Sequence, residues 1–426
     1  MNSNYKGMRS GFATVTTLFF MWGFITVSVD PLIAALKSIF ELSYAEAMLA
    51  QFAFFMAYFV VSLPAAALIA RLGNSKSIIF ALGVMIAGCL IVPAATHFDT
   101  FELVLVALFV IASGITILQV VANPLAAALG PPERSHFRLT FSQTFNSLGT
   151  FLAPYLIAGI LLTGGIFDLP KGTPITPELR VESFDKIDQA FLLIAGALVL
   201  LAIFIFVLRR LLDVAKPVDE GQRPSVAPAL KSPWALFGSA AIFLYVGAEV
   251  SIGSAMTNFL HEPDMLNVSL EDAGKMVSLY WGGAMVGRLI GSGLLFVVKD
   301  RAPWLLAAFA LGASLLCFAV TQLHGHTAAY LALSIGLFNS IMFPVIFTST
   351  LERSSASPAA TSGLLCLAIV GGAILPYVYG LIADKAGLHT AYFLPAIAYV
   401  LIVVFAVAAT RAKIYQHGTA SAAAGH

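Results

Sequence analysis

The chain has 426 residues, of which 59% are hydrophobic and only 11% are charged, and its formal net charge is +1. A soluble globular protein carries about 25% charged residues. Together with a mean hydropathy of +0.91, this composition excludes the soluble classes and predicts a polytopic membrane protein. The near-neutral charge gives no indication of a nucleic-acid partner. The three cysteines, Cys89, Cys317 and Cys366, are far apart and predict neither a disulfide framework nor a metal site.

Apolar runs of membrane-spanning length recur along the whole chain. A helix needs about 20 apolar residues to cross a bilayer. Twelve predicted spans cover residues 12–36, 45–70, 76–97, 101–126, 138–163, 189–211, 234–260, 271–298, 302–322, 327–350, 359–384 and 388–412. The first run is longer than a signal-peptide core, and we interpret it as a retained helix. The predicted fold is all-α with twelve transmembrane helices.

Two polar stretches interrupt the apolar pattern, at residues 164–188 and 213–233. The second contains proline and charge without an apolar period, which is typical of a linker. It divides the chain into an N-terminal six-helix half, residues 1–212, and a C-terminal six-helix half, residues 234–426.

The two predicted halves repeat each other. The pattern Gly-x4-Pro-Tyr occurs at residues 149–155 and again at 371–377, an offset of 222, and Pro124 and Pro344 are offset by 220. Chance matching of residues common in membrane helices is the alternative, but similar offsets at two places favour a true repeat. Two six-helix repeats related by an axis along the membrane normal are the major facilitator arrangement.

Basic residues predict the orientation of the spans. With the N-terminus inside, most of the 23 Lys and Arg residues fall in cytoplasmic loops, as the positive-inside rule requires. We therefore expect both termini to be cytoplasmic and the chain to lie in the cytoplasmic membrane.

Three charged residues lie inside predicted spans: Asp30 in the first, Glu249 in the seventh and Arg288 in the eighth. A charge in the bilayer centre costs roughly 2.5–3.5 kcal/mol on insertion scales, so it usually faces a cavity and is functional. The first and seventh spans are equivalent in the repeat, so Asp30 and Glu249 are predicted to line a central cavity.

Asp30 is the candidate proton-coupling residue, because burial favours the protonated form of a carboxyl group. Pro31 follows it and predicts a local break in the helix. The alternative is a structural carboxylate that pairs with an Arg or caps a broken helix. For Glu249 three roles remain open, namely a ligand for substrate hydroxyls, a second ion site and a structural role.

Neutral hydrogen-bonding side chains cluster at helical spacing within the spans. They are Thr116, Gln119 and Asn123 in the fourth span, Gln143 and Asn146 in the fifth, and Asn339 in the tenth. Amides also tie membrane helices together, but their concentration in one half favours a polar ligand. Amides and a carboxylate donate to and accept from hydroxyls, which indicates a sugar. Trp22, two turns before Asp30, is a candidate to stack on a pyranose ring; helix packing or interfacial anchoring is the alternative.

A short basic turn with Arg71 and Lys76 joins the second and third spans and resembles a shortened form of the cytoplasmic loop of major facilitators. Gly287 and Arg288 are its candidate counterpart in the other half. We assign Arg71, Lys76 and Arg288 to gating. The sequence has no phosphate-binding glycine loop, catalytic triad or metal motif. It therefore predicts no enzyme, no ATP-driven pump and no cofactor.

Several segments carry a specific resemblance to a known family. They are FFMWGF (19–24), SGITILQVVANPLAAALGPPE (113–133), FRLTFSQTFNSLGT (137–150), YVGAEVSIGS (245–254), LFNSIMFPVIFT (337–348) and SGLLCLAIVGGAILP (362–376). They resemble the fucose–galactose–glucose–proton symporter family of major facilitators, and most of all its glucose/galactose branch. The resemblance covers nearly the whole chain.

The resemblance implies roles for individual residues. Asp30 matches the aspartate of the first span that is assigned to proton coupling. Gln119 stands where the fucose-transporting branch has a functional glutamate, and Gln143 and Asn146 match sugar-site amides. Glu249 lies where that branch has glutamine. The family commonly has Asn-Asp in the first span, whereas here Val29 precedes Asp30.

The resemblance implies a bacterial inner-membrane symporter of glucose or galactose with a proton, working by alternating access. We expect the chain to work in the lipid bilayer as a monomer. The alternatives are another sugar, such as L-fucose or N-acetylglucosamine, and sodium in place of the proton. Transport of a different solute, or a sugar sensor that does not transport, would be compatible with the same fold.

Overall fold

The structure is a computed structural model that describes residues 2–129, 135–168, 176–213, 226–298 and 301–414. Within these residues it is built of helices, without strands. The N-terminal half contains α1 (Asn2–Ile39), α2 (Tyr44–Leu72), α3 (Asn74–His97), α4 (Phe101–Ala128), α5 (Ser135–Leu161), the short η2 (Gly165–Asp168) and α6 (Pro177–Leu212). The C-terminal half contains η3 (Ala229–Lys231), α7 (Pro233–His261), α8 (Leu270–Val298), α9 (Ala302–Val320), α10 (Gly325–Asn339), α11 (Met342–Arg353), α12 (Pro358–Leu367), η5 (Ala368–Val370), α13 (Gly371–Ala391) and α14 (Phe393–Arg411).

Most of these helices are long and apolar enough to cross a membrane. Among the described residues, 11 segments meet that description, with α10 and α11 counted as one and α12 and α13 as another. The remaining long helix, α8, has 29 residues and carries Arg288 within its length. The prediction of an all-α membrane protein of two six-helix halves is confirmed.

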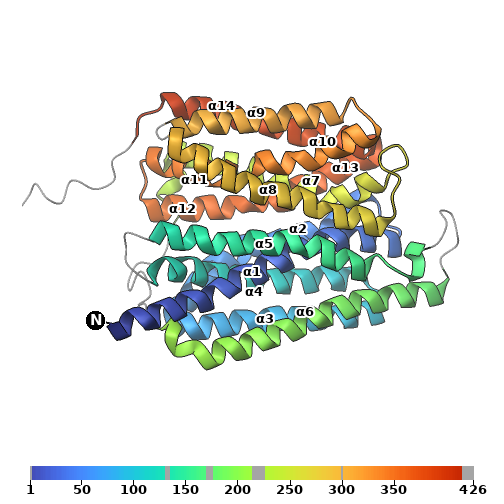
Figure 1. The fold of residues 1–426 in the computed structure, drawn as a ribbon, viewed down its shortest axis with the longest axis horizontal. Helices are drawn as coiled ribbons and strands as arrows, with labels where there is room; N and C mark the ends of the chain where they lie inside the picture. The colour runs from blue at the N-terminus through green and yellow to red at the C-terminus, as the bar shows by residue number, and fades with distance from the viewer. Residues whose placement is uncertain (1, 130–134, 169–175, 214–225, 299–300, 415–426) are drawn as a thin grey trace, which may run out of the picture.

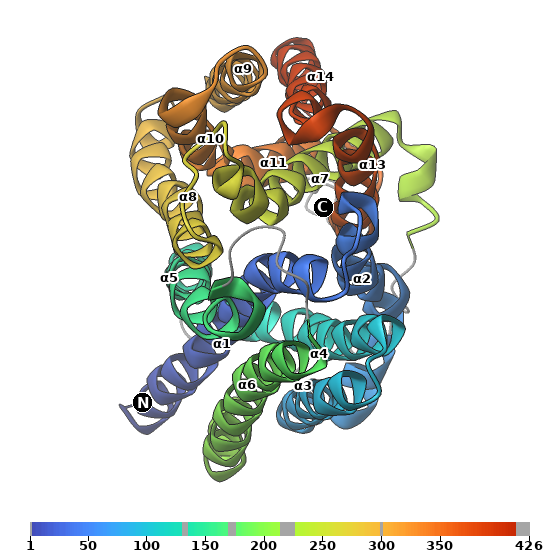
Figure 2. The ribbon, with the colours of Figure 1, turned by 90° about the vertical axis from the view of Figure 1, so that its right-hand side faces the viewer.

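The two halves lie one above the other with all long helices roughly parallel (Figure 1). Seen along the helices, α1, α2 and α5 of the N-terminal half face α7, α8 and α13 of the C-terminal half (Figure 2). The main contacts between halves are α5 with α8, α2 with α13, and α1 with α7. The predicted linker 213–233 joins them, but residues 214–225 lie outside the described residues.

Equivalent glycines make equivalent helix crossings, which gives the repeat a physical basis. A Cβ at Gly149 of α5 would clash with the backbone carbonyl of Phe20 in α1. A Cβ at Gly371, where α13 begins, would clash in the same way with the carbonyl of Phe243 in α7. Each half therefore brings its first helix into close backbone contact with the helix that carries the Gly-x4-Pro-Tyr pattern.

Two local predictions were wrong. The break expected at Asp30 is not present, because α1 runs as one helix through Pro31; packing can hold a membrane helix straight through a proline. The stretch 164–188 is helical from Pro177 onward, because Thr176 caps α6 by accepting a hydrogen bond from the N–H of Leu179 at 3.4 Å.

The tenth and eleventh predicted spans are each divided in two. The tenth becomes α10 and α11, with the break at Ser340 and Ile341. Pro344 has no N–H to donate to the carbonyl four residues before it, at Ser340, so the helix loses a bond there. The eleventh becomes α12 and α13 with the 3₁₀ turn η5 between them.

The halves are joined at one end of the bundle, which we call the distal end: the end that carries the α1–α2 and α7–α8 connections. The carboxylate of Asp384 in α13 accepts hydrogen bonds from the backbone N–H groups of Tyr44, at 2.6 Å, and Ala45, at 2.9 Å, where α2 begins. The Tyr44 hydroxyl donates to Glu262 just after α7, at 2.8 Å. A carboxylate from one half thus caps the first turn of a helix in the other.

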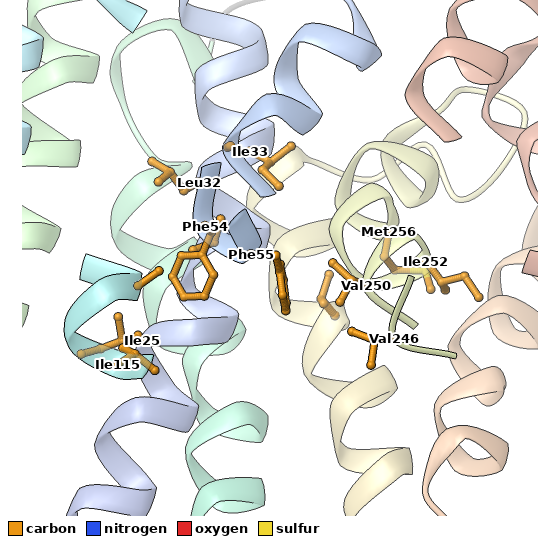
Figure 3. Close-up of a cluster of buried hydrophobic side chains, with 14 of the residues drawn as sticks. Ile25, Leu32, Ile33, Phe54, Phe55, Ile115, Val246, Val250, Ile252 and Met256 are labelled. Atoms are coloured by element: carbon orange, nitrogen blue, oxygen red, sulfur yellow. The ribbon is translucent and has the colours of Figure 1, made fainter. Parts of the chain in front are cut away.

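Apolar contacts join the halves in the interior. Figure 3 shows Phe54 pointing toward Ile25 within the N-terminal half, whereas the neighbouring Phe55 points toward Val246 and Val250 of α7. Phe55 also packs on Gly372, where a Cβ would come within 2.9 Å of its ring. The absence of a side chain at that glycine lets the ring cross between the halves.

The glycine crossings generate a stability prediction. Gly149→Ala and Gly371→Ala should each lower the melting temperature of the purified protein, because over-packing typically costs about 1–3 kcal/mol. Gly196→Ala in α6 is the matched control, since nothing lies within 4 Å of a Cβ at that position. Equal melting temperatures for all three variants would show that the close helix crossings do not contribute to the stability of the halves.

Candidate functional site

Asp30 lies at the meeting point of both halves. Its side chain is 2% exposed. One carboxylate oxygen, Oδ1, accepts hydrogen bonds from Gln51 Nε2 at 3.2 Å and from Ser254 Oγ at 3.0 Å. The other, Oδ2, accepts from Trp281 Nε1 at 3.0 Å. Gln51 belongs to the N-terminal half, whereas Ser254 and Trp281 belong to α7 and α8 of the C-terminal half.

The three donors are held in place by packing and by each other. Gln51 Nε2 also donates to Ser254 Oγ, at 2.8 Å. A Cβ at Gly253 would come within 3.0 Å of the Trp281 ring and 3.5 Å of Asp30 Oδ2, so this glycine makes room for the indole beside the carboxylate. Asp30 is therefore a buried carboxyl group whose hydrogen bonds come from both halves.

Sequence reasoning did not identify Gln51, Ser254 or Trp281. The repeat contained a usable indication for one of them. Ser254 lies 224 residues after Asp30, within a few residues of the offsets that relate the halves, so the repeat indicates this part of α7. Gln51 and Trp281 carry no such pattern, because their contacts depend on how the halves pack.

Glu249 sits in a separate cluster within the C-terminal half. The Tyr245 hydroxyl donates to Glu249 Oε1 at 2.8 Å, and the Arg288 guanidinium acts on the carboxylate electrostatically. Arg288 Nη1 also donates to Ser147 Oγ in α5, at 2.6 Å. Arg288 therefore lies at the interface between the two halves. Its partner Ser147 directly follows Asn146 in the chain.

Asn339 is fully buried and takes part in a chain of hydrogen bonds across four helices. The Tyr399 hydroxyl donates to Asn339 Oδ1 at 2.7 Å, and Asn339 Nδ2 donates to the Tyr280 hydroxyl at 2.7 Å. Tyr280 in turn donates to the backbone carbonyl of Glu249, at 3.0 Å. In this conformation both ends of the Asn339 amide are engaged in holding α14, α10, α8 and α7 together.

The polar residues of α4 present a different arrangement. Gln119 Nε2 donates to the Tyr58 hydroxyl of α2 at 2.8 Å. Asn123, one turn further on, is half-buried, and no described residue bonds its buried Oδ1 atom. Thr116 is buried and bonds the carbonyl of Ala112 in its own helix, at 2.8 Å.

The predicted residues of α5 and α1 contribute mainly to helix contacts. Asn146 Nδ2 donates to the carbonyl of Phe19 at 3.1 Å and so ties α5 to α1. Gln143, one turn earlier, is half-buried. Trp22 is 4% exposed, with its ring 4.1 Å from that of Phe19. The tryptophan that contacts the Asp30 carboxylate is Trp281, not Trp22.

The predicted gating residues lie in unlike environments. Arg71 and Lys76 are exposed, on either side of Gly73, whose φ of 78° makes the tight turn between α2 and α3. The neighbouring Ser75 donates through its hydroxyl to Asp213 at 2.9 Å, which ties this turn to the end of α6. Arg288 instead lies in the bundle interior.

The comparisons with known proteins agree with this architecture. The chain matches the Major Facilitator Superfamily over residues 12–365. It belongs to that superfamily. It is 43% identical over 407 residues to a glucose/galactose transporter of Brucella abortus, covering 94% of each chain. It is 28% identical over 412 residues to the L-fucose–proton symporter of Escherichia coli, covering 93% of this chain and 92% of that one.

A solved structure gives the same result in three dimensions. The crystal structure of FucP, a major facilitator transporter in the outward conformation, aligns with a TM-score of 0.68 and 26% identity over 95% of this chain and 99% of that one. The sequence-based assignment to the symporter family, and to transporters instead of enzymes, is confirmed.

The series of hydrogen bonds through Asn339 generates a prediction. Asn339→Ala removes the buried acceptor of the Tyr399 hydroxyl and the donor to the Tyr280 hydroxyl, which should lower the free energy of unfolding by about 1–3 kcal/mol. Tyr399→Phe removes only the hydrogen bond from Tyr399 to Asn339 and should lower the free energy of unfolding by less. Both are measured by thermal melting in detergent without sugar; an unchanged melting temperature for Asn339→Ala would assign the amide to a role other than joining helices.

Proposed function

We propose that this protein is a multi-pass transporter of the bacterial inner membrane that takes up a hexose, glucose or galactose, together with a proton by alternating access. The observation that carries the proposal is the Asp30 carboxylate, buried within α1 and bonded by donors from both halves. Such a group changes its environment whenever the halves move apart, which is what a coupling site must do. The named activities of the relatives support the sugar and the proton.

We place both termini in the cytoplasm, from the distribution of Lys and Arg. The distal end then faces the outside, and the contacts of Asp384 and Glu262 close that side. The chain divides into the halves 1–212 and 234–426, which rock around the site, and each chain works as a monomer. Arg71, Lys76 and Arg288 are proposed to control the opposite, cytoplasmic side.

The sugar site is proposed to lie between the halves, beside Asp30. Gln119, Gln143 and Asn123 of the N-terminal half offer amide donors and acceptors, and Glu249 of the C-terminal half offers a carboxylate. Asn146, Asn339 and Trp22 complete the predicted set, although in this conformation their side chains contact neighbouring helices. Movement of one elementary charge through the membrane potential supplies about 2.3 kcal/mol per 100 mV, enough for modest sugar accumulation.

The proton-coupling role is tested with Asp30→Asn. In proteoliposomes with an imposed pH gradient, this variant should lose accumulation of labelled glucose or galactose, because the amide cannot exchange the coupling proton. Sugar counterflow without a gradient should survive. Full gradient-driven accumulation by Asp30→Asn would refute the assignment, and loss of counterflow as well would indicate a structural or sugar-binding role.

The sugar site is tested with Gln119→Leu. This variant should bind hexose about tenfold more weakly, since leaving a buried polar partner unpaired costs roughly 1–3 kcal/mol. Gln322→Leu, at an exposed position after α9, is the control and should bind normally. The readout is competition against labelled glucose, and equal affinities for both variants would remove Gln119 from the site.

A further inference from the structure

Four buried polar side chains between the halves each have an atom that no described residue bonds. They are Gln51 (Oε1), Thr257 (Oγ1), Asn258 (Nδ2) and Ser278 (Oγ). Asn258, the most exposed of the four, is only 8% exposed. An unpaired polar group in a buried position costs free energy, and native proteins keep few of them. Four such groups at one interface therefore indicate a second state of the protein in which they have partners.

We propose that Thr257, Asn258 and Ser278 form the outer part of the sugar site and bind hydroxyl groups of the incoming hexose when the outer side opens. Gln51 lies opposite them, on α2 of the N-terminal half. The inference rests on the proposed function, to which it adds residues of the C-terminal half that contact the sugar on entry.

Asn258 lies on the face of α7 that meets α2. One turn before it, Ser254 Oγ accepts a hydrogen bond from Gln51 Nε2 at 2.8 Å. One turn after it, at the end of α7, Glu262 accepts a hydrogen bond from the Tyr44 hydroxyl at 2.8 Å. Positions four apart share a face of a helix. Asn258 is therefore placed between two contacts with the opposite half.

Ser278 has the equivalent position on α8, on the face that meets α5. One turn before it, a Cβ at Gly274 would come within 2.7 Å of the Ala158 side chain. One turn after it, a Cβ at Gly282 would come within 2.8 Å of the Phe151 ring. Both neighbours belong to α5 of the N-terminal half, so Ser278 also lies between two contacts across the interface.

Thr257 lies between these two positions. It directly precedes Asn258 in α7, and its methyl group is 3.7 Å from the place that a Cβ on Gly274 of α8 would take. Helices α7 and α8 contact each other and face the N-terminal half (Figure 2). Thr257, Asn258 and Ser278 therefore occupy adjoining faces of two neighbouring helices.

These faces lie on the way from the distal end to Asp30. The contact between Tyr44 and Glu262 is at the distal end, and Ser254 bonds Asp30 at 3.0 Å deeper in the protein. With the distal end outside, as proposed above, a sugar that enters passes Asn258 before it reaches Asp30. Opening of the outer side separates α7 and α8 from α2 and α5 and exposes the unpaired atoms to that sugar.

The four side chains suit a neutral ligand that carries hydroxyl groups. Serine and threonine hydroxyls donate and accept, an amide nitrogen donates, and an amide oxygen accepts. None of the four carries a charge, so they offer no counter-ion to a charged ligand. The hydroxyls of a hexose also donate and accept, and can therefore bond each of them. Water has the same hydrogen-bonding chemistry, and sugars that lack single hydroxyls distinguish the two sources.

The first experiment measures initial uptake of labelled hexose from the outside. Thr257→Val, Asn258→Leu and Ser278→Ala should each raise the KM for external hexose about threefold to tenfold, the effect of losing one hydrogen bond, with the maximal rate retained. Thr327→Val, at an exposed position in α10, is the matched control and should leave the KM unchanged. An unchanged KM in all three variants, or a lower maximal rate at an unchanged KM, would overturn the inference.

Monodeoxy hexoses separate contact with the sugar from contact with water alone. Each analogue competes with the labelled hexose for uptake and gives an inhibition constant. If Asn258 bonds one particular hydroxyl, Asn258→Leu should weaken binding of the parent sugar but not of the analogue that lacks this hydroxyl, because groups in direct contact do not contribute additively. Equal weakening of all analogues would assign the unpaired atoms to water alone and would overturn the inference.

The melting temperature in detergent without sugar tests for a structural role. Thr257→Val and Ser278→Ala remove hydroxyl oxygens that no described residue bonds, so neither variant should melt at a lower temperature than the wild-type protein. A fall in both would show that these hydroxyls join helices, and would contradict the inference.

The wild-type protein decides between the two proposals. If it takes up no hexose, the proposed function fails and this inference fails with it. If it takes up hexose while the three variants keep the wild-type KM, only the outer part of the sugar site fails and the proposed function stands.

Discussion

The structure depends on one constraint: a carboxylate buried inside a membrane protein must have donors. Asp30 meets this requirement by drawing on both halves, with Gln51 on its own side and Ser254 and Trp281 on the other. An unpaired charge at this depth would cost several kcal/mol. Two of the three hydrogen bonds of Asp30 therefore exist only in an arrangement in which the halves are in contact.

Close backbone contact makes this meeting point possible. Gly149 and Gly371 let the first helix of each half lie directly against its partner, which fixes α1 and α7 at the centre of the interface. The repeat then brings the part of α7 that carries Ser254 against Asp30. The halves are alike in backbone but not in chemistry, since one supplies the acid and the other supplies donors. That asymmetry is what allows a symmetric scaffold to couple an ion to movement.

Much of the fold could be predicted because local composition determines each span. The repeated glycine and proline positions indicated that the chain consists of two equivalent halves. Asp30, Glu249 and Arg288 stood out because charge is rare in spans. The contacts of these residues could not be predicted in the same way. Gln51 and Trp281 are ordinary residues in their own helices, and only tertiary packing brings them to Asp30. The helix through Pro31 and the break at Ser340 were missed because each proline removes one backbone hydrogen bond, and the surrounding structure decides whether the helix continues all the same.

The contacts that join the halves at the distal end and at Asp30 differ in kind, and the difference suits the alternating-access cycle proposed above. Asp384 is exposed and caps α2 at the surface, where water competes and ion contacts are worth little, typically about 0–1 kcal/mol. Asp30 is buried, where its hydrogen bonds are stronger but depend on its charge. The exposed contact can open and close at little cost in free energy. The buried one requires its donors to separate from Asp30, so the two respond differently when the halves move.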